Sequence, residues 1–438
     1  MSLNRSAPGA ARRGKALLAG AVALLLALSF ASPAFGQTNL VVAVHFGSNS
    51  QEARGFMEVK EAFEQLHPGV EVQYLWTTSL AGSGLSHTSK LLTMIAGGTS
   101  PDVAMVVSHL TPAYAHQGIL LGLSSYMERS GVSRSDIIPP ALMQGVWDGE
   151  VYALPLIVDP NFAMVWNKQY FAEAGLDPNR GPATLAEYEE YYRRLTRRNP
   201  DGTVTRIAHT LWNAYGYVNA MWTWGWIFGG DFYDYATNKV TAADPRLIEA
   251  LEFLNRYHDE YNVPALPKEM YFPNNEAINF WVSGHLKYLL DTRPDLEIGV
   301  GPMPRLNESA PSPAWIGGYG IGVLKDAPNP DLAWEFVRFI AASEQGTEIF
   351  ASISGWIPGY LKSPVMMEFL RDPYMGVYLQ VAQEARNYRP AMPAIVEYEQ
   401  MLNDYVSDVF AGERVPADAL REVQELVQAK LDEILARR

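Results

Sequence analysis

Aromatic and amide side chains gather in one short stretch of the chain. Asn219 is followed by three tryptophans, Trp222, Trp224 and Trp226. Aromatic rings can pack flat against the C–H face of a sugar ring, and amide groups can bond to its hydroxyls. The stretch therefore favours carbohydrate binding, with Asn219, Trp222 and Trp226 as candidate contacts. The alternative is a strand or helix that packs one or two of the tryptophans into the core. Other tryptophans that we expect in the core are Trp212, Trp281 and Trp334.

A second group of candidates follows predicted strands. Ligands of open α/β sheets bind beyond the carboxyl ends of the strands, so polar and aromatic residues there are candidate contacts. Strands are predicted at residues 40–44, 70–74, 103–107, 154–156 and 288–290. The residues that follow these strands are Ser48, Asn49, Trp76, Ser108, His109, Asp159, Asp291 and Arg293.

Some of these candidates have plainer alternatives. A lone histidine such as His109 is more often a hydrogen-bonded structural residue than a ligand contact. Arg293 can donate several hydrogen bonds to a sugar or pair with a carboxylate or phosphate of a ligand. It can equally pair with Asp291 beside it.

The elements that must hold these residues alternate along the chain. Strand, helix, strand, helix and strand follow one another over residues 40–107, which is typical of an α/β fold with a parallel sheet. The apolar run at 103–107 suits a strand buried on both faces. Further helices are predicted behind Thr184, where Glu187 completes a capping box, and behind Asp244 and Asn329. A strand at 163–166, another at 321–324 and an amphipathic helix near the end complete the pattern.

The composition bounds the class of protein. Basic residues, an apolar run and small residues follow one another within residues 1–36, which predicts a cleaved secretory signal peptide. The run is shorter than the ~20 apolar residues of a spanning helix. The chain has no cysteine, so neither disulfides nor a lipid-modified cysteine are expected, which favours a freely diffusing periplasmic protein. A net charge of −14 disfavours nucleic acid as a partner.

Several segments, in order, resemble the family 1 extracellular solute-binding proteins, the family that includes the maltose-binding proteins. Their order and spacing across the chain carry the resemblance more than any one of them. They are GGTSPDV at 97–103, GEVYALP at 149–155, MVWNKQYF at 164–171, AGL at 174–176, FGG at 228–230, GGYGI at 317–321 and AWEFVRFI at 333–340.

The resemblance implies an α/β, periplasmic-binding-protein-like fold of type II, with two lobes that close on a ligand by hinge bending. The chain is expected to cross between lobes near residues 157–160 and 315–318. The glycines at 317, 318 and 320 suit either a hinge or a plain turn before a strand. The implied division, after the signal peptide, is an N-terminal lobe of residues 37–157 and 318–350 and a C-terminal lobe of residues 158–317 and 351–438.

The resemblance also implies a function and further contacts. The protein would be the monomeric binding component of an ABC importer, without cofactor or metal, delivering its ligand to membrane permease subunits. Trp222 falls where the family stacks a sugar ring, Asn219 on a neighbouring contact and Asp159 on an acidic contact. Ligand contacts of family members near the second crossing and a returning loop suggest Trp315, Tyr319 and Trp356. Where the family has a Gly-aromatic ending to one strand, residues 291–293 read Asp-Thr-Arg, which predicts an unusual pocket floor.

Two other functions compete with sugar binding. A polyamine or organic-acid receptor is the closer rival, because polyamine sites also combine aspartates with tryptophans. A secreted glycoside hydrolase would need two carboxylates at about 5–10 Å across one bond. Asp159, Asp231, Asp234 and Asp291 could supply such a pair, but their spacing does not require it, and we expect no enzymatic activity.

Overall fold

The computed structural model describes residues 38–77, 84–211, 216–261 and 271–437. The predicted signal peptide and Trp212 lie outside these residues. None of the helices in the described ranges is long and apolar enough to cross a membrane.

The larger sheet is built from segments that are far apart in the sequence. Its strands run in the order β15-β14-β3-β1-β2, and β6 pairs with β14. As predicted, β1 pairs parallel with both β2 and β3, whereas β14 is antiparallel to β3 and β6. The strands are β1 (Thr38–Val44), β2 (Val70–Trp76), β3 (Val103–Val107), β6 (Leu154–Asn161), β14 (Trp315–Val323) and β15 (Asn387–Tyr388).

The two predicted lobe crossings lie side by side in this sheet. Gly317 of β14 is paired with Asp159 of β6, and Gly318 is paired with Val158. The glycines therefore belong to a strand that is paired on both sides, rather than to a turn that precedes one.

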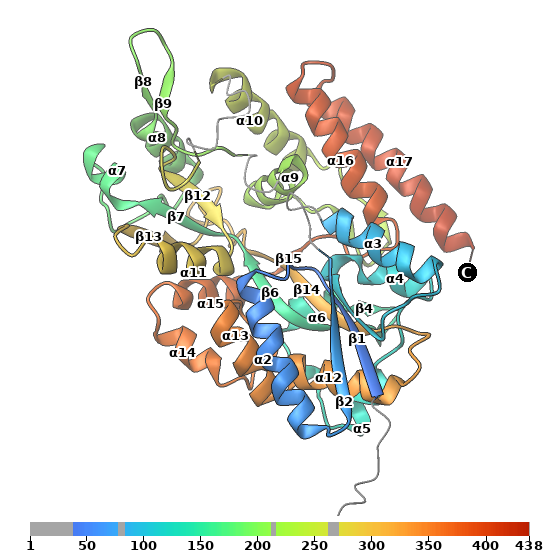
Figure 1. The fold of residues 1–438 in the computed structure, drawn as a ribbon. Coiled ribbons are helices and arrows are strands. Elements are labelled where there is room, and N and C mark those ends of the chain that lie inside the picture. The colour runs from blue at the N-terminus through green and yellow to red at the C-terminus, as the bar shows by residue number, and fades with distance from the viewer. Residues whose placement is uncertain (1–37, 78–83, 212–215, 262–270, 438) are drawn as a thin grey trace, which may run out of the picture.

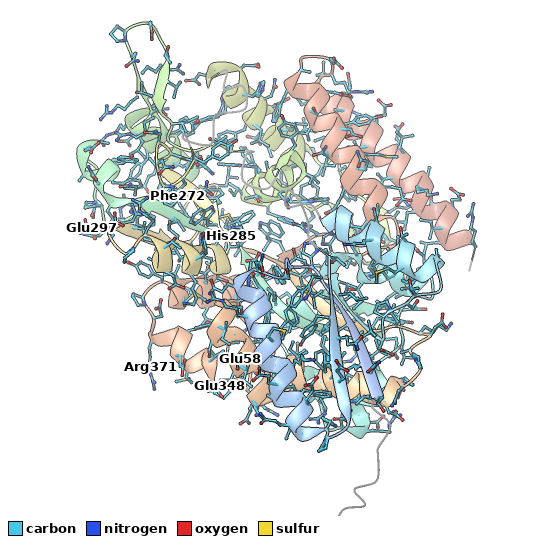
Figure 2. The ribbon with its side chains drawn as sticks, in the orientation of Figure 1. Glu58, Phe272, His285, Glu297, Glu348 and Arg371 are labelled. Atoms are coloured by element: carbon cyan, nitrogen blue, oxygen red, sulfur yellow. The ribbon has the colours of Figure 1, made fainter. Side chains whose placement is uncertain are left out.

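The helices beside this sheet pack in close pairs. Figure 2 shows Glu58 on α2 and Glu348 on α13, two helices that pack against each other. Gly55 of α2 permits this approach, because a Cβ atom at that position would lie 3.1 Å from the ring of Phe350. The helices of this half are α2 (Gln51–Leu66), α3 (Gly84–Ala96), α12 (Pro330–Ala342) and α13 (Glu344–Ser354).

A smaller antiparallel sheet forms the centre of the other half of the molecule. It has the order β12-β7-β13, and the helices α9, α10, α16 and α17 form a group beside it (Figure 1). Its elements are β7 (Ala163–Asn167), β12 (Ile278–Trp281), β13 (Ile298–Gly301), α7 (Lys168–Glu173), α8 (Leu185–Leu195), α9 (Gly216–Ile227), α10 (Pro245–Tyr261), α11 (Ser283–Thr292), α16 (Ile395–Phe410) and α17 (Pro416–Ala436).

Shorter elements connect these layers. They are a 3₁₀ turn at Ser108–Leu110, another at Arg134–Asp136, α4 (Thr111–His116), α5 (Ser124–Arg129), α6 (Pro139–Gln144), β4 (Val146–Trp147), β5 (Glu150–Val151), β8 (Arg197–Arg198), β9 (Val204–Arg206), β10 (Tyr233–Asp234), β11 (Lys239–Val240), α14 (Val365–Arg371) and α15 (Met375–Glu384).

The predicted helix starts are confirmed. The Thr184 side chain accepts a hydrogen bond from the Glu187 amide at the start of α8. The Glu187 carboxylate reaches back to the amide of Ala183, one residue before the one that a capping box would use. Asn329 caps α12 by accepting from the amide of Leu332.

The predicted strand at residues 288–290 is wrong. These residues belong to α11, and the strand of this region is β12, ten residues earlier in the chain. Leu286 and Leu289 lie buried on one face of α11, whereas Tyr288 is 62% exposed. The three residues form part of an amphipathic helix. The prediction failed because a run of three apolar residues is too short to distinguish the helical repeat of about 3.6 residues from the strand repeat of about 2.

Candidate functional site

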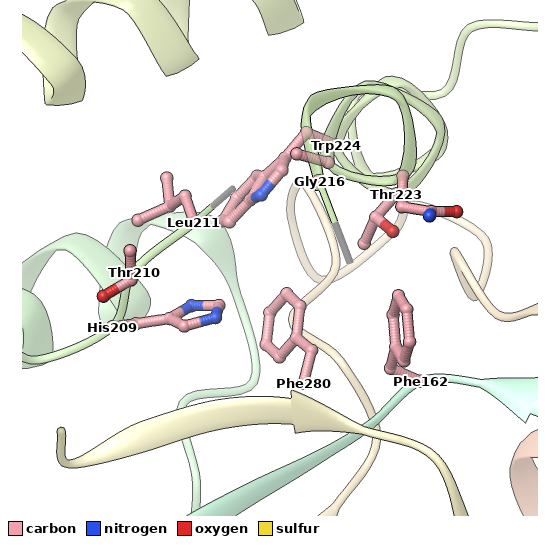
Figure 3. A pocket seen from close by; sticks show the side chains of 10 residues that line it. Phe162, His209, Thr210, Leu211, Gly216, Thr223, Trp224 and Phe280 are labelled. Carbon is pink, nitrogen blue, oxygen red and sulfur yellow. The ribbon is translucent and has the colours of Figure 1, made fainter. Parts of the chain in front are cut away.

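A small hollow of about 20 Å³ lies between α9 and the smaller sheet (Figure 3). The rings of Phe162, Trp224 and Phe280 form its apolar walls. Polar groups stand between the rings, and none of the described lining residues carries a carboxylate, ammonium or guanidinium group. The polar lining residues are His209, Thr210, Asn219 and Thr223.

Helix α9 presents two of the polar groups. Asn219 and Thr223 are four residues apart, so they lie on the same face of the helix. Thr223 is only 2% exposed, and its hydroxyl has no hydrogen-bond partner among the described residues. Figure 3 shows this side chain directed toward the rings of Phe162 and Phe280. A buried hydroxyl without a partner costs about 1–3 kcal/mol, which a ligand hydroxyl in the hollow would offset.

His209 is a neutral group in this wall. Its Nδ1 lies 2.8 Å from the hydroxyl of Tyr188. Burial lowers the pKa of His209 to about 3, because an imidazolium would be poorly solvated there. The residue therefore offers hydrogen bonds without a charge at every pH at which the protein would work.

Glu276 lies behind the wall and holds it in place. Its carboxyl group accepts hydrogen bonds from the amide of Thr210 at 2.6 Å, the amide of Phe272 at 3.0 Å and Nδ2 of Asn279 at 2.9 Å. Two backbone segments and strand β12 are thus joined at one buried side chain. Burial nevertheless raises the pKa of Glu276 to about 7, since desolvation disfavours the carboxylate more than these donors favour it.

The fold should consequently lose stability as the pH rises toward 7. Because the folded-state pKa of Glu276 exceeds the ordinary value of 4.5, the folded state binds the extra proton, and the stabilisation is complete below pH 4.5 and lost as the pH passes about 7. Relative to Glu276→Gln, the wild type should lose roughly 3 kcal/mol of unfolding free energy over this range. Urea unfolding of both proteins between pH 4.5 and 8 measures it. A pH-independent difference between them would contradict the assignment.

Trp222, which was predicted to face a ligand, does not line the hollow. Trp222 is 0% exposed, and its ring packs edge-on against Phe232 and Tyr398 at 4.3 and 5.3 Å. Trp226 is also buried and lies against Trp315, with ring centroids 5.1 Å apart. Helix α9 is apolar on nearly all sides, so it lies inside the molecule. The tryptophan of this stretch that lines the hollow is Trp224.

Three predicted residues meet in a buried network next to the hollow. His109 follows β3, Asn219 belongs to α9, and Trp315 opens β14. They converge on two residues that the sequence did not indicate, Arg389 and Glu399. The Arg389 guanidinium lies 5.2 Å from the Trp315 ring centroid, and His109 Nε2 lies 2.9 Å from Glu399 Oε1. Ser108 is buried in the same 3₁₀ turn as His109.

A second group of predicted residues lies at the crossing strands. Asp159 is buried in β6, and Tyr319 of β14 packs against His45 with ring centroids 4.8 Å apart. Burial, followed by the charge of Asp159, raises the pKa of Tyr319. Trp356 Nε1 donates to Glu52 Oε1 at 2.9 Å. Asp159, Tyr319 and Trp356 thus flank the crossing rather than the hollow itself.

The remaining candidates lie elsewhere. Ser48 and Asn49 are exposed in the loop before α2, and Trp76 packs against Tyr74 at 5.2 Å. Asp291 and Arg293, which were predicted to form a pocket floor, both lie at the exposed end of α11. Asp291 pairs with Lys287 at 3.0 Å and Arg293 with Asp295 at 3.2 Å, so the two do not pair with each other.

Comparison with known proteins identifies the family. Residues 47–347 match the bacterial extracellular solute-binding proteins, and the chain belongs to that family. The diacetylchitobiose binding protein DasA of Streptomyces coelicolor is 25% identical over 351 residues, covering 76% of this chain and 78% of that protein. The maltotriose-binding protein of Pyrococcus abyssi is 23% identical over 343 residues, covering 76% of this chain and 68% of the relative.

A solved structure confirms the fold. CpMnBP1 with mannobiose bound superimposes with a TM-score of 0.77 at 22% identity, covering 89% of this chain and all of that one. The two halves described above are therefore the two α/β lobes of a type II periplasmic binding protein, as predicted. The larger sheet belongs to one lobe and the smaller sheet to the other.

Proposed function

We propose that the protein is the periplasmic binding component of an ABC importer and that it holds a mono- or oligosaccharide between its lobes. The supporting observation is the lining of the hollow on the lobe of the smaller sheet, which combines three aromatic rings with hydroxyl, amide and neutral imidazole groups. Such a surface matches an uncharged molecule with apolar ring faces and many hydroxyls. The relatives named for diacetylchitobiose and maltotriose point to the same class of ligand.

The rival ligands fit this lining less well. A polyamine needs carboxylates around it, and an organic acid needs a cation; the described lining offers neither. Arg389 and Glu399 lie nearby, but their charges offset each other. A glycoside hydrolase would need a pair of carboxylates at the hollow, so we propose binding without catalysis.

Ligand capture is proposed to close the lobes, and the closed form is the one that permease subunits would recognise. The division proposed above, with residues 37–157 and 318–350 in one lobe and 158–317 and 351–438 in the other, places both crossings in the β6–β14 pair. Its boundary between residues 350 and 351 falls within α13, and it assigns β15 to the second lobe although this strand pairs with β14 in the larger sheet.

A panel of ligands tests the proposal. Mannobiose, maltotriose and diacetylchitobiose should raise the thermal midpoint, because a ligand that binds only the folded state stabilises it by mass action. Spermidine, succinate and citrate serve as the rival panel. Stabilisation by one of these and by none of the sugars would contradict sugar binding, and chromatographic detection of cleaved sugar would contradict binding without catalysis.

Thr223→Val should weaken sugar binding without unfolding the protein. Valine keeps the shape of threonine and removes one hydrogen bond to the ligand, which is worth about 0.5–1.5 kcal/mol, or a roughly two- to tenfold rise in Kd. Thr111→Val is the matched control, because the Thr111 hydroxyl is also buried and has no partner in the described chain but lies on α4, away from the hollow. Isothermal titration of both variants with the best-binding sugar measures the difference, and equal Kd values would place the ligand elsewhere.

A further inference from the structure

One guanidinium group joins residues of both lobes beside the hollow. Arg389 follows β15, which pairs with Trp315 and Ile316 at the start of β14. The Arg389 side chain is 15% exposed. Nη1 lies 3.1 Å from His109 Nδ1, Nη2 donates to Asn219 Oδ1 at 2.5 Å, and Nε lies 3.8 Å from Glu399 Oε1.

These contacts fix the hydrogen positions of two neighbours. Arginine has only donors, so both atoms that face its Nη groups must accept. His109 therefore carries its proton on Nε2, which lies 2.9 Å from Glu399 Oε1. Asn219 is oriented with its oxygen toward Arg389, so the other tip of this side chain is the NH₂ donor.

We infer that Arg389 is a positioning residue that presents the amide of Asn219 as a hydrogen-bond donor to an oxygen atom of the ligand. The inference rests on the proposed function, since Asn219 lines the hollow. A hydroxyl, ring or glycosidic oxygen can accept from this amide, whereas a protonated amine cannot. Arg389 thus affects which ligands bind by orienting the neutral amide of Asn219, and not by placing its own charge against the ligand.

The same network ties this selection to lobe closure. His109 comes directly after β3 of the larger sheet, and Asn219 and Glu399 belong to helices of the other lobe. Arg389 contacts all three in this structure, so it bridges residues of both lobes. A lobe opening that moved His109 away from Asn219 would break this network and release the orientation of the amide.

The first test uses the ligand-free protein. Nitrogen NMR of His109, assigned with His109→Gln, should show a neutral ring with the proton on Nε2 at pH 7. Burial is the main cause that lowers the pKa of His109; Arg389 lowers it further, and Glu399 raises it. Arg389→Gln should consequently raise the titration midpoint of His109. A proton on Nδ1 in the wild type, or an unchanged midpoint in the variant, would overturn the inference.

The second test is binding of whichever of mannobiose, maltotriose and diacetylchitobiose binds the wild type best. Asn219→Ala and Arg389→Lys should each raise Kd about tenfold, and the double variant should be no weaker than either, because both remove one interaction. Asn219→Asp separates positioning from structure: the carboxylate still accepts from Arg389 and keeps the thermal midpoint, but it cannot donate, so binding should fall as in Asn219→Ala.

The outcomes distinguish this inference from the proposed function. Wild-type affinity in Asn219→Asp, or additive losses in the double variant, would overturn the role of Arg389 while leaving sugar binding intact. Failure of all three sugars to bind the wild type would overturn the proposed function, and the oxygen acceptor assigned to the ligand with it.

Discussion

Replacing Trp222 by alanine should lower the free energy of unfolding by about 3–5 kcal/mol, the usual loss for a buried tryptophan. The side chain is enclosed by Phe232, Tyr398 and Trp226, and alanine would leave a cavity that the rigid rings around it cannot fill. Urea unfolding followed by far-ultraviolet circular dichroism measures the loss.

Two controls sharpen this experiment. Trp147→Ala removes a half-buried tryptophan from the short strand β4 and should cost less. Trp222→Phe retains most of the buried ring and should recover much of the stability. A stable Trp222→Ala protein that no longer binds sugar would show instead that this side chain contacts the ligand, as the sequence suggested.

Gly318→Ala should destabilise the protein by about 2–4 kcal/mol through backbone strain and a collision between strands. Gly318 has a φ of +116°, which only glycine adopts readily, and a Cβ atom there would lie 2.0 Å from the carbonyl oxygen of Ile157. Because Ile157 belongs to the paired strand β6, relief requires that the two strands separate where the chain passes between lobes. Thermal unfolding measures the change.

Gly202→Ala is the matched control for this strain. Gly202 also has a positive φ, +89°, but nothing lies within 4 Å of a Cβ atom at that position. It should therefore cost only about 1–2 kcal/mol for the unfavourable backbone angle. Equal losses for the two variants would mean that the strand collision at Gly318 relaxes at no cost.

Regular periodicity made much of the fold predictable. The strands at 40–44, 70–74 and 103–107 and the helices behind Thr184, Asp244 and Asn329 were all found in place, because each combines a clear apolar period with a turn or capping residue. The order of the family segments predicted the two-lobed architecture. Residues 288–290 were predicted as a strand but belong to a helix, because three apolar residues are too few to show either a helical or a strand repeat.

The site was less predictable because its residues are set by long-range packing. Tryptophans spaced by two, as at 222, 224 and 226, fit a half-buried strand as well as a wholly buried helix, and only the helix places Trp224 at the hollow. Asn219 and His109 were named from local patterns. Arg389 and Glu399 had no such signal, since Arg389 is positioned by the two-residue strand β15, whose pairing with β14 has no sequence pattern.

The strand order of the larger sheet also governs when the molecule can fold. β14 lies between β3 and β6, yet it is synthesised long after both, and β15 later still. Until residue 323 is available, those earlier strands have exposed edges that are prone to pair with other chains. Contacts so distant in sequence also slow folding. The sheet needs strands from both the N-terminal and the C-terminal part of the polypeptide. We therefore expect a fragment that stops before β14 to aggregate. For the same reason, no single cut of the chain can yield this lobe as an independent domain.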